Sequence, residues 1–457
     1  MKAAVHLALK KDWLVALSFA LLFVVHATMI RPVVQNADPV LYAYQIEQHD
    51  FVSRAIHIGY FLVGTVFHAV LPFRTDTSLN VMALTFGVGG AFALYSAASL
   101  LGSRAAGVCS VVFLLCSRSY VRGMLMAEVD ILEASLVTMS FALYVNKRAV
   151  AAGLVFGVAM LVTPVAVAML PLFLATFPVI RGEGRELLRR QTKRIFWFGI
   201  CALFVYLPYV AWNYHGYVYG PRGLATAPRL PFDIAAQAIR GWKFFARESR
   251  AMMVLYFAGI VSALLTKRLW LTDQVGLGVS LSIALTVAIA DRADVPVHLP
   301  NIVILCLLAA LLVDRLAATT KLAWCVPLAA AAMIARPAYA VARAEVSLQD
   351  HRRKLYESMR AQSRPFDVIV VGVSGFTGTR VFERYAYGES HPGTALTPRE
   401  FRDYAKRHRR KPGSGEIWCA GGVPDSIQAE LEKTYELTSR RAEGTNFGVL
   451  VPRLPKH

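Results

Sequence analysis

Apolar stretches long enough to cross a lipid bilayer recur from residue 13 to about residue 340 of this chain. They dominate its composition, since 56% of the residues are hydrophobic, only 17% are charged, and the mean hydropathy is +0.46. A soluble domain of 457 residues does not need so much apolar surface. The pattern therefore predicts a mainly α-helical, polytopic membrane bundle. About eleven spans are expected, at about 13–30, 79–101, 105–119, 129–146, 149–163, 164–180, 195–213, 251–266, 269–290, 299–316 and 322–340.

The placement of charge predicts how these spans are oriented. Lysines up to Lys11 precede the first span, so the positive-inside rule places the N-terminus in the cytosol. No clean cleavage site follows this span, which is therefore expected to remain as a signal anchor. Residues 55–73 contain His57 and His68, and a helix lying on the outer surface there keeps the later basic loops cytosolic. Residues 31–78 then form an extracytoplasmic loop with juxtamembrane helices, and the C-terminus lies outside.

The chain divides by composition into a transmembrane module at 1–341 and a tail at 342–457. In the tail, charged residues become denser and apolar residues fall into short runs. Strands are expected near 368–371, 416–419, 435–439 and 447–451, with helices between them. The tail is therefore predicted to be a small, soluble, extracytoplasmic α/β domain. The glycines at 372–378 follow its first strand, but no acidic residue stands at the distance that a dinucleotide site needs.

Charge and cysteine usage exclude several function classes. The net charge of +19 comes from basic residues scattered among the loops, which argues against nucleic acid and agrees with affinity for anionic lipid headgroups. Five of the six cysteines lie in apolar segments, so no disulfide framework is expected. No zinc spacing is present, so no metal site is predicted. No cofactor follows from the sequence, although a divalent cation is left open.

Ionisable residues gather at the outer ends of the spans, where burial beside lipid is costly. Asp38 heads the polar segment after the first span and is the candidate catalytic carboxylate. The other candidate site residues lie in the same outer segment and at the outer ends of later spans: Tyr42, Glu47, His49, Asp50, His57, Arg122, Glu128, Asp130, Arg240, Lys243, Arg292 and His298. A carboxylate can deprotonate an acceptor hydroxyl while cations hold an anionic leaving group, so the combination indicates acid–base chemistry beside a phosphate. For any single arginine here, snorkelling at the interface or an ion pair within the bundle is the favoured explanation.

The order of these features resembles the GT-C glycosyltransferases. This family includes the protein O-mannosyltransferases, the aminoarabinose transferases of lipid A and the bacterial glycosyltransferase family 39 relatives. The resemblance is carried by Asp38 to Ala43, His57 to Leu62, Ala127 to Leu132, Val158 to Pro164 with Leu170-Pro171, and Asp291 to Pro300. Pro39 stands where the family usually has a second acid, and the two prolines that usually follow the histidine of the second motif are missing after His57.

The resemblance implies a membrane glycosyltransferase with a GT-C-like module at 1–341. Such an enzyme moves a sugar from a polyprenyl-phosphate donor to a glycan, lipid or protein acceptor on the extracytoplasmic face, with inversion. Asp38 would act as general base or orient the acceptor hydroxyl, and Glu128 or Asp130 would position sugar or acceptor. Arg292 and His298, with a cation from the loop that carries Arg240 and Lys243, would bind the lipid phosphate. The expected location is a bacterial inner membrane, with a role in cell-envelope biogenesis.

Two readings outside catalysis remain open at this stage. A transporter or flippase would show internal repeats and polar groups at mid-membrane depth. The ionisable residues gather at one face instead, and no similarity between the two halves of the chain is evident. A membrane subunit of a polysaccharide or glycolipid assembly pathway, without activity of its own, would leave Asp38 without a catalytic role.

Overall fold

The structure is a computed structural model. It describes residues 13–30, 37–49, 57–175, 185–214, 271–289 and 299–317, and in the C-terminal part 339–340, 343–344, 367–370, 394–396, 406–407, 415–419, 434–442 and 445–453, with a few single residues besides. Contacts divide the chain into two compact units. The first comprises 1–30, 51–72 and 80–343, and the second comprises 31–50, 73–79 and 344–457.

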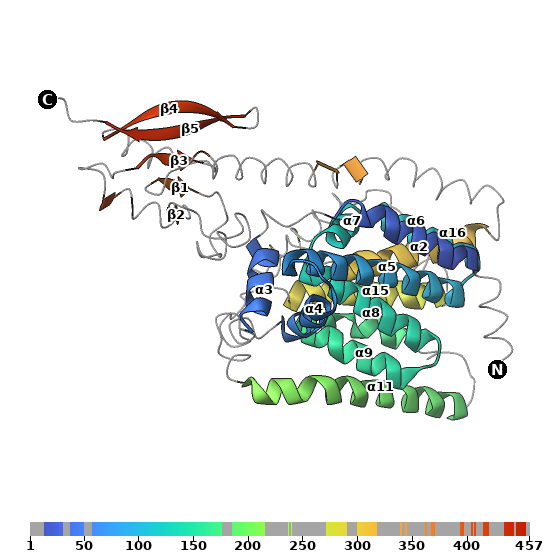
Figure 1. Cartoon of the computed structure of the whole chain (residues 1–457). Coiled ribbons are helices and arrows are strands. Elements are labelled where there is room, and N and C mark those ends of the chain that lie inside the picture. Colours follow the sequence, from blue (N-terminus) through green and yellow to red (C-terminus); the bar gives the residue numbers. More distant parts are fainter. Residues whose placement is uncertain are drawn as a thin grey trace. The chain divides into compact units, whose positions relative to one another are not determined.

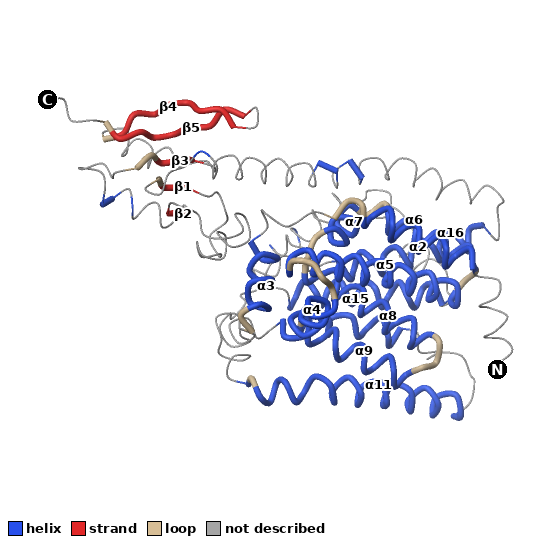
Figure 2. The backbone as a smooth tube through the Cα atoms, in the orientation of Figure 1, coloured by secondary structure: helices blue, strands red, loops and turns tan. Residues whose placement is uncertain are grey.

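The first unit is helical, and most of its helices overlap the spans that hydropathy predicts, whereas α7 lies mostly between two of those spans and α11 begins ten residues earlier than expected (Figures 1 and 2). They are α2 (Trp13–Ala27), α4 (Ile58–Val70), α5 (Thr75–Leu101, which begins in the second unit), α6 (Arg104–Leu115), α7 (Arg118–Leu125), α8 (Val129–Val145), α9 (Ala149–Val162), the 3-10 helix η2 (Pro164–Met169), α10 (Leu170–Ala175), α11 (Arg185–Trp212), α15 (Leu271–Ile289) and α16 (Leu299–Ala317). The predicted span at 251–266 lies outside the described residues, and so does the one at 322–340 except for its last two residues.

Two described helices, Thr75–Leu101 and Gln191–Trp212, are long and apolar enough to cross a membrane. A third span results if α6 and α7, which meet at a 74° bend, count as one broken span. The α4 helix has 13 residues and lies within the range where a helix is expected, at 55–73. The count of about eleven spans stays a prediction.

The core of the first unit forms where helices α8, α9 and α11 pack side by side (Figure 1). Glycines allow the close approach: a Cβ atom on Gly157 would lie 2.7 Å from the carbonyl oxygen of Ala202, and one on Gly153 would overlap the Phe198 carbonyl. Because Gly153 faces Phe198 and Gly157 faces Ala202, α9 and α11 run parallel. Rings of Tyr144, Phe141, Phe156, Phe173 and Phe198 fill the space between the helices.

Helix α16 is buried nearly all round. Every residue from Ile302 to Val313 is buried, and the helix contacts α6, α8 and α15. A run that is apolar on all faces is expected to lie inside a bundle rather than at its surface. The continuous apolar sequence from Ile302 therefore predicts that α16 lies inside the bundle.

The second unit contains helix α3 (Ala37–Glu47) and one mixed sheet. Its strands are β1 (Val368–Val370), β2 (Thr394–Leu396), β3 (Ile417–Cys419), β4 (Tyr435–Ala442) and β5 (Thr445–Pro452), in the order β2-β1-β3-β5-β4. Strands β1, β2 and β3 are parallel, while β5 is antiparallel to both β3 and β4. Four strands lie where the sequence predicts them, and β2 was not expected. The glycines at 372–378 lie outside the described residues.

Candidate functional site

The turn between α7 and α8 carries three of the predicted site residues: Arg122, Glu128 and Asp130. We call them the α7–α8 corner. The Arg122 guanidinium lies 3.6 Å from the Glu128 carboxylate, and the side chains are 41% and 12% exposed. Glu128 is the N-cap of α8, and Asp130 lies in its first turn, where the helix dipole favours negative charge. The corner therefore presents a cation and two carboxyl groups at one helix start.

Buried tyrosines hold this corner in place. The hydroxyl of Tyr60, on α4, donates to the carbonyl oxygen of Ala127 at 2.9 Å. The hydroxyl of Tyr120, on α7, donates to the carbonyl oxygen of Gly87 at 2.6 Å. Both side chains are fully buried. Since a buried hydroxyl is costly to leave unsatisfied, these bonds tie the corner to α4 and α5.

His57 lies at the start of α4 and contacts the end of α9. Its Nδ1 atom is 2.8 Å from the carbonyl oxygen of Val162. A carbonyl only accepts, so Nδ1 carries a proton and donates to it. Gly59 makes the approach close, because a Cβ atom there would lie 2.7 Å from the backbone nitrogen of Val162. Helix α9 ends at Val162, and after Thr163 the 3-10 helix η2 begins at Pro164.

Glu133 is a carboxyl group that the sequence analysis missed. It lies one turn beyond Asp130 on α8, is 1% exposed, and neither of its oxygens has a hydrogen-bond partner among the described residues. Buried carboxyl groups are normally paired or hydrogen-bonded, and ionisable residues within membrane helices usually mark functional positions. The signal was present in the sequence as an acid three residues after Asp130 in an otherwise apolar run.

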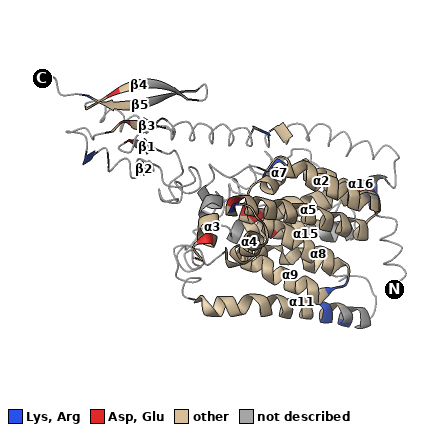
Figure 3. Cartoon of the chain, in the orientation of Figure 1, with Lys and Arg blue, Asp and Glu red and all other residues tan. Residues whose placement is uncertain are grey.

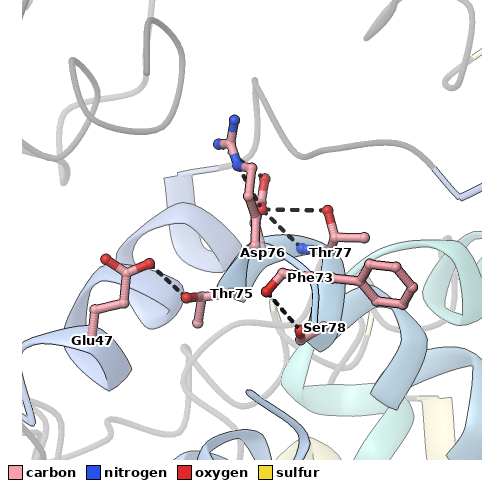
Figure 4. A network of polar contacts seen from close by, with 7 residues as sticks. Glu47, Phe73, Thr75, Asp76, Thr77 and Ser78 are labelled. Carbon is pink, nitrogen blue, oxygen red and sulfur yellow. Dashed lines mark hydrogen bonds and ion pairs between the residues drawn. The ribbon is translucent and has the colours of Figure 1, made fainter. Parts of the chain in front are cut away.

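A second polar cluster lies in the second unit, where α3 meets the beginning of α5 (Figure 4). The Thr75 hydroxyl donates to Glu47 at 2.5 Å. The fully buried Asp76 carboxylate accepts from the Thr77 backbone N–H at 2.9 Å and lies 3.3 Å from the Arg74 guanidinium. Of these residues only Glu47 was predicted as part of a site. The others follow a pattern typical of a helix start, a hydroxyl and an acid in the first turn.

The remaining predicted residues are placed as follows. Asp38 is the second residue of α3, so the segment that it heads is helical. On the same helix Tyr42 is buried, with 4% of its side chain exposed. His49 follows the helix, is exposed, and has a φ of 53°, in the left-handed region. The residues that lie outside the described part of the chain are Asp50, Arg240, Lys243, Arg292 and His298.

Each unit thus brings together part of the predicted site. The first unit joins Arg122 to Glu128, with Asp130 on the same helix start, and places His57 against α9. The second unit places Asp38, Tyr42 and Glu47 on one helix. In the described ranges no three His, Cys, Asp or Glu side chains lie close enough together to hold a metal ion.

Comparisons with known proteins identify the fold. No family model matches the chain, and no curated protein matches it in sequence. The structure of ArnT from Cupriavidus metallidurans in the apo state aligns with 96% of this chain and 98% of its own, with a TM-score of 0.57 and 14% sequence identity. A structure of the same protein bound to undecaprenyl phosphate gives a TM-score of 0.56, with the same identity and coverage.

A second protein has the same arrangement. The oligosaccharyltransferase of Archaeoglobus fulgidus, in complex with Zn and sulfate, aligns with 93% of this chain and 72% of its own, with a TM-score of 0.54 and 13% identity. The chain therefore has the GT-C fold that its sequence resemblance predicts, and two of its described helices are long and apolar enough to cross a membrane.

Proposed function

We propose that this protein is a membrane glycosyltransferase that moves a sugar from a polyprenyl-phosphate donor to an acceptor on the extracytoplasmic face. The observation that carries the proposal is the fold likeness, which runs over 96% of the chain. One of the similar structures holds undecaprenyl phosphate, and another belongs to an oligosaccharyltransferase. The first supports a lipid-phosphate donor, and the second supports a sugar as the transferred group.

Asp38 is the proposed general base. It lies in the first turn of α3, a helix fixed at its other end by the hydrogen bond between Glu47 and Thr75. In the proposed reaction Asp38 takes the proton from the acceptor hydroxyl, the hydroxyl oxygen attacks the anomeric carbon, and the bond from that carbon to the phosphate oxygen breaks. Attack opposite the leaving phosphate inverts the anomeric configuration. A positioned general base contributes about 10²- to 10⁴-fold to the rate.

The α7–α8 corner is the proposed binding site for the sugar or the acceptor. Carboxylate oxygens accept hydrogen bonds from hydroxyl groups, and Glu128 and Asp130 offer such oxygens within three residues. The Arg122 side chain is 41% exposed, so it can also reach a ligand. The proposed partners of the donor phosphate are Arg240, Lys243, Arg292 and His298, because cations stabilise the negative charge that develops on a departing phosphate.

The test is a transfer assay with the full chain in nanodiscs. Polyprenyl-phosphate sugars are supplied with the donor sugar labelled, and release of free polyprenyl phosphate is measured together with appearance of labelled product. The proposal predicts that the two are formed in equal amounts. Transfer from a soluble nucleotide sugar, with no release of polyprenyl phosphate, would overturn the proposal.

Arg292→Ala tests the donor assignment in the same assay. A charge-assisted hydrogen bond is worth about 1.5–3 kcal/mol, which corresponds to roughly tenfold to a hundredfold weaker donor binding. The KM for the acceptor should change little. A raised acceptor KM with an unchanged donor KM would reverse the assignment and place the acceptor at Arg292.

A further inference from the structure

The end of the bundle opposite the α7–α8 corner collects basic side chains. Helix α8 is about 25 Å long, at 1.5 Å per residue over its 17 residues, so its two ends are far apart. At its far end Lys147 and Arg148 form the turn into α9, and both are exposed. Because α9 and α11 run parallel with Gly153 against Phe198, Arg194 lies level with the start of α9. Figure 3 shows lysine and arginine gathered at this end of α9 and α11.

The turn itself is tightly built. The N–H of Lys147 donates to the carbonyl of Tyr144, and the N–H of Arg148 donates to the carbonyl of Leu143. Lys147 has a φ of 63°, so the helix ends in a Schellman motif with a left-handed residue after its cap. The two basic residues are therefore held at a fixed place, where the negative end of the α8 dipole also favours them.

Arg194 is the least usual member of this group. The Cζ atom of its guanidinium lies 4.2 Å from the centroid of the Tyr144 ring, so a cation–π contact fixes the group. Its Nε and Nη2 atoms are buried, and within the described residues neither has a hydrogen-bond partner. A guanidinium has five N–H donors in a planar fork, which matches the oxygens of a phosphate. Arg194 as a whole is only partly buried, so an anion at the surface of the bundle can approach this guanidinium.

In the described part of the chain, no carboxylate forms an ion pair with Arg194 or with the basic residues beside it. The ion pairs found there are Arg74 with Asp76 and Arg122 with Glu128, and both involve other cations. Lys193 and Arg189, one helical turn apart on α11, are also exposed. Among the described residues, an anion reaching Arg194 would therefore meet several cations and no carboxylate paired with them.

An apolar groove continues from this basic end along α11. Exposed residues recur at spacings of four and three after Lys193, which places them on one face of the helix: Trp197, Ile200, Phe204 and Leu207. A groove of about 490 Å³ is lined by Ile200, Leu203, Phe204, Leu207, Pro208 and Ala211. From Ile200 to Ala211 it follows about 16 Å of helix, at 1.5 Å per residue. A soluble anion gains nothing from contact with this apolar lining, whereas an acyl chain can pack against it.

We infer that this end of the bundle binds an anionic phospholipid. Its phosphate lies on Arg194, with Lys193 and Arg148 beside it, and one acyl chain follows the groove along α11. This site is distinct from the α7–α8 corner, the proposed site for the sugar or the acceptor, which lies at the other end of α8. The bound lipid would fasten α11 to the α8–α9 turn and make the packing of the three helices depend on anionic lipid in that leaflet.

The test measures binding of phosphatidylglycerol and phosphatidylcholine with matched acyl chains to the full-length protein, by native mass spectrometry after delipidation. Wild type is expected to bind phosphatidylglycerol at least tenfold more tightly. Arg194→Gln should remove this preference, whereas Arg104→Gln, which neutralises an exposed cation at the start of α6, should leave it within twofold. Equal affinity for both lipids, or an equal loss in the Arg104 variant, would overturn the inference, since only general surface charge would then be involved.

Two further measurements separate the headgroup from the chain. Inorganic phosphate at 1000-fold excess should not displace the lipid, because it cannot use the groove, and displacement would mean that the site takes a soluble anion. Phe204→Ser should weaken the binding of long-chain phosphatidylglycerol several-fold and leave a short-chain analogue unchanged. An equal effect on both lengths would contradict the groove. If Arg194→Gln fails to fold, the double variant of the exposed Lys193 and Arg148 to Gln takes its place, with the same expected loss.

Discussion

Gly59→Ala tests how α4 is seated on α9. Two effects oppose each other. Alanine favours a helix over glycine by up to about 1 kcal/mol. Against this, the new Cβ atom would lie 2.7 Å from the Val162 nitrogen and 2.8 Å from the Leu161 carbonyl carbon, both backbone atoms that cannot rotate away. Overpacking of this kind costs about 1–3 kcal/mol, so after the helix preference is subtracted the variant should be destabilised by up to about 2 kcal/mol.

Gly199→Ala is the matched control. Gly199 lies within α11, and a Cβ atom there would meet nothing within 4 Å. Only the helix preference remains, so this variant should gain up to about 1 kcal/mol. The two substitutions are chemically identical, and the structure predicts opposite signs for them.

The assay is reversible unfolding of the purified protein by SDS in mixed micelles, followed by circular dichroism, with glycosyl transfer measured on the same samples. Displacement of α4 in Gly59→Ala should also stretch the 2.8 Å contact between His57 and Val162 and lower transfer. Equal or greater stability of Gly59→Ala than of wild type would refute the close packing of α4 on α9.

Three other predictions follow from single contacts. Glu133→Leu should raise the free energy of unfolding by about 1–3 kcal/mol, because it removes two buried oxygens without partners, and should lower transfer; a more stable and fully active variant would show that the carboxyl group has no role. A double-mutant cycle of Arg122→Gln and Glu128→Gln should give a coupling of about 0.2–1 kcal/mol, since Arg122 is 41% exposed, and zero coupling would contradict the ion pair. Asp367→Ala removes the acceptor of the Glu416 backbone N–H at 2.9 Å and should cost the tail about 1–3 kcal/mol, seen as faster hydrogen exchange at the start of β3; unchanged exchange there would contradict this bond.

Hydropathy predicts the helices well because their apolar runs are long. The expected span at 129–146 corresponds to α8 at Val129–Val145, and the one at 299–316 to α16 at Leu299–Ala317. The start of α5 is earlier than expected, at Thr75 instead of 79, because its polar first turn does not register as apolar. Strand β2 was missed for a related reason, since Thr394–Leu396 is too short to show an alternating pattern.

The candidate site was predictable only in part. Arg122, Glu128 and Asp130 stand close together in sequence, so their grouping could be expected. The contact between His57 and Val162 joins residues far apart in the chain, and spacing alone cannot predict it. Asp76 was missed because an acid in the first turn of a helix is common whether or not its side chain is buried. Glu133 could have been found, since it is an acid in an otherwise apolar run three residues after Asp130. Burial is decided by packing against helices that are distant in sequence.

The most direct test of the proposed reaction is the rate of sugar transfer by wild type and by Asp38→Asn, in nanodiscs with a polyprenyl-phosphate sugar as donor. Asparagine keeps the size of the side chain but cannot act as a base, so the rate should fall by about 10²- to 10⁴-fold with unfolding unchanged. Glu436→Gln, an exposed carboxyl on β4, serves as the control and should transfer at the wild-type rate. A rate for Asp38→Asn within a few-fold of wild type would contradict the assignment of Asp38 as the base.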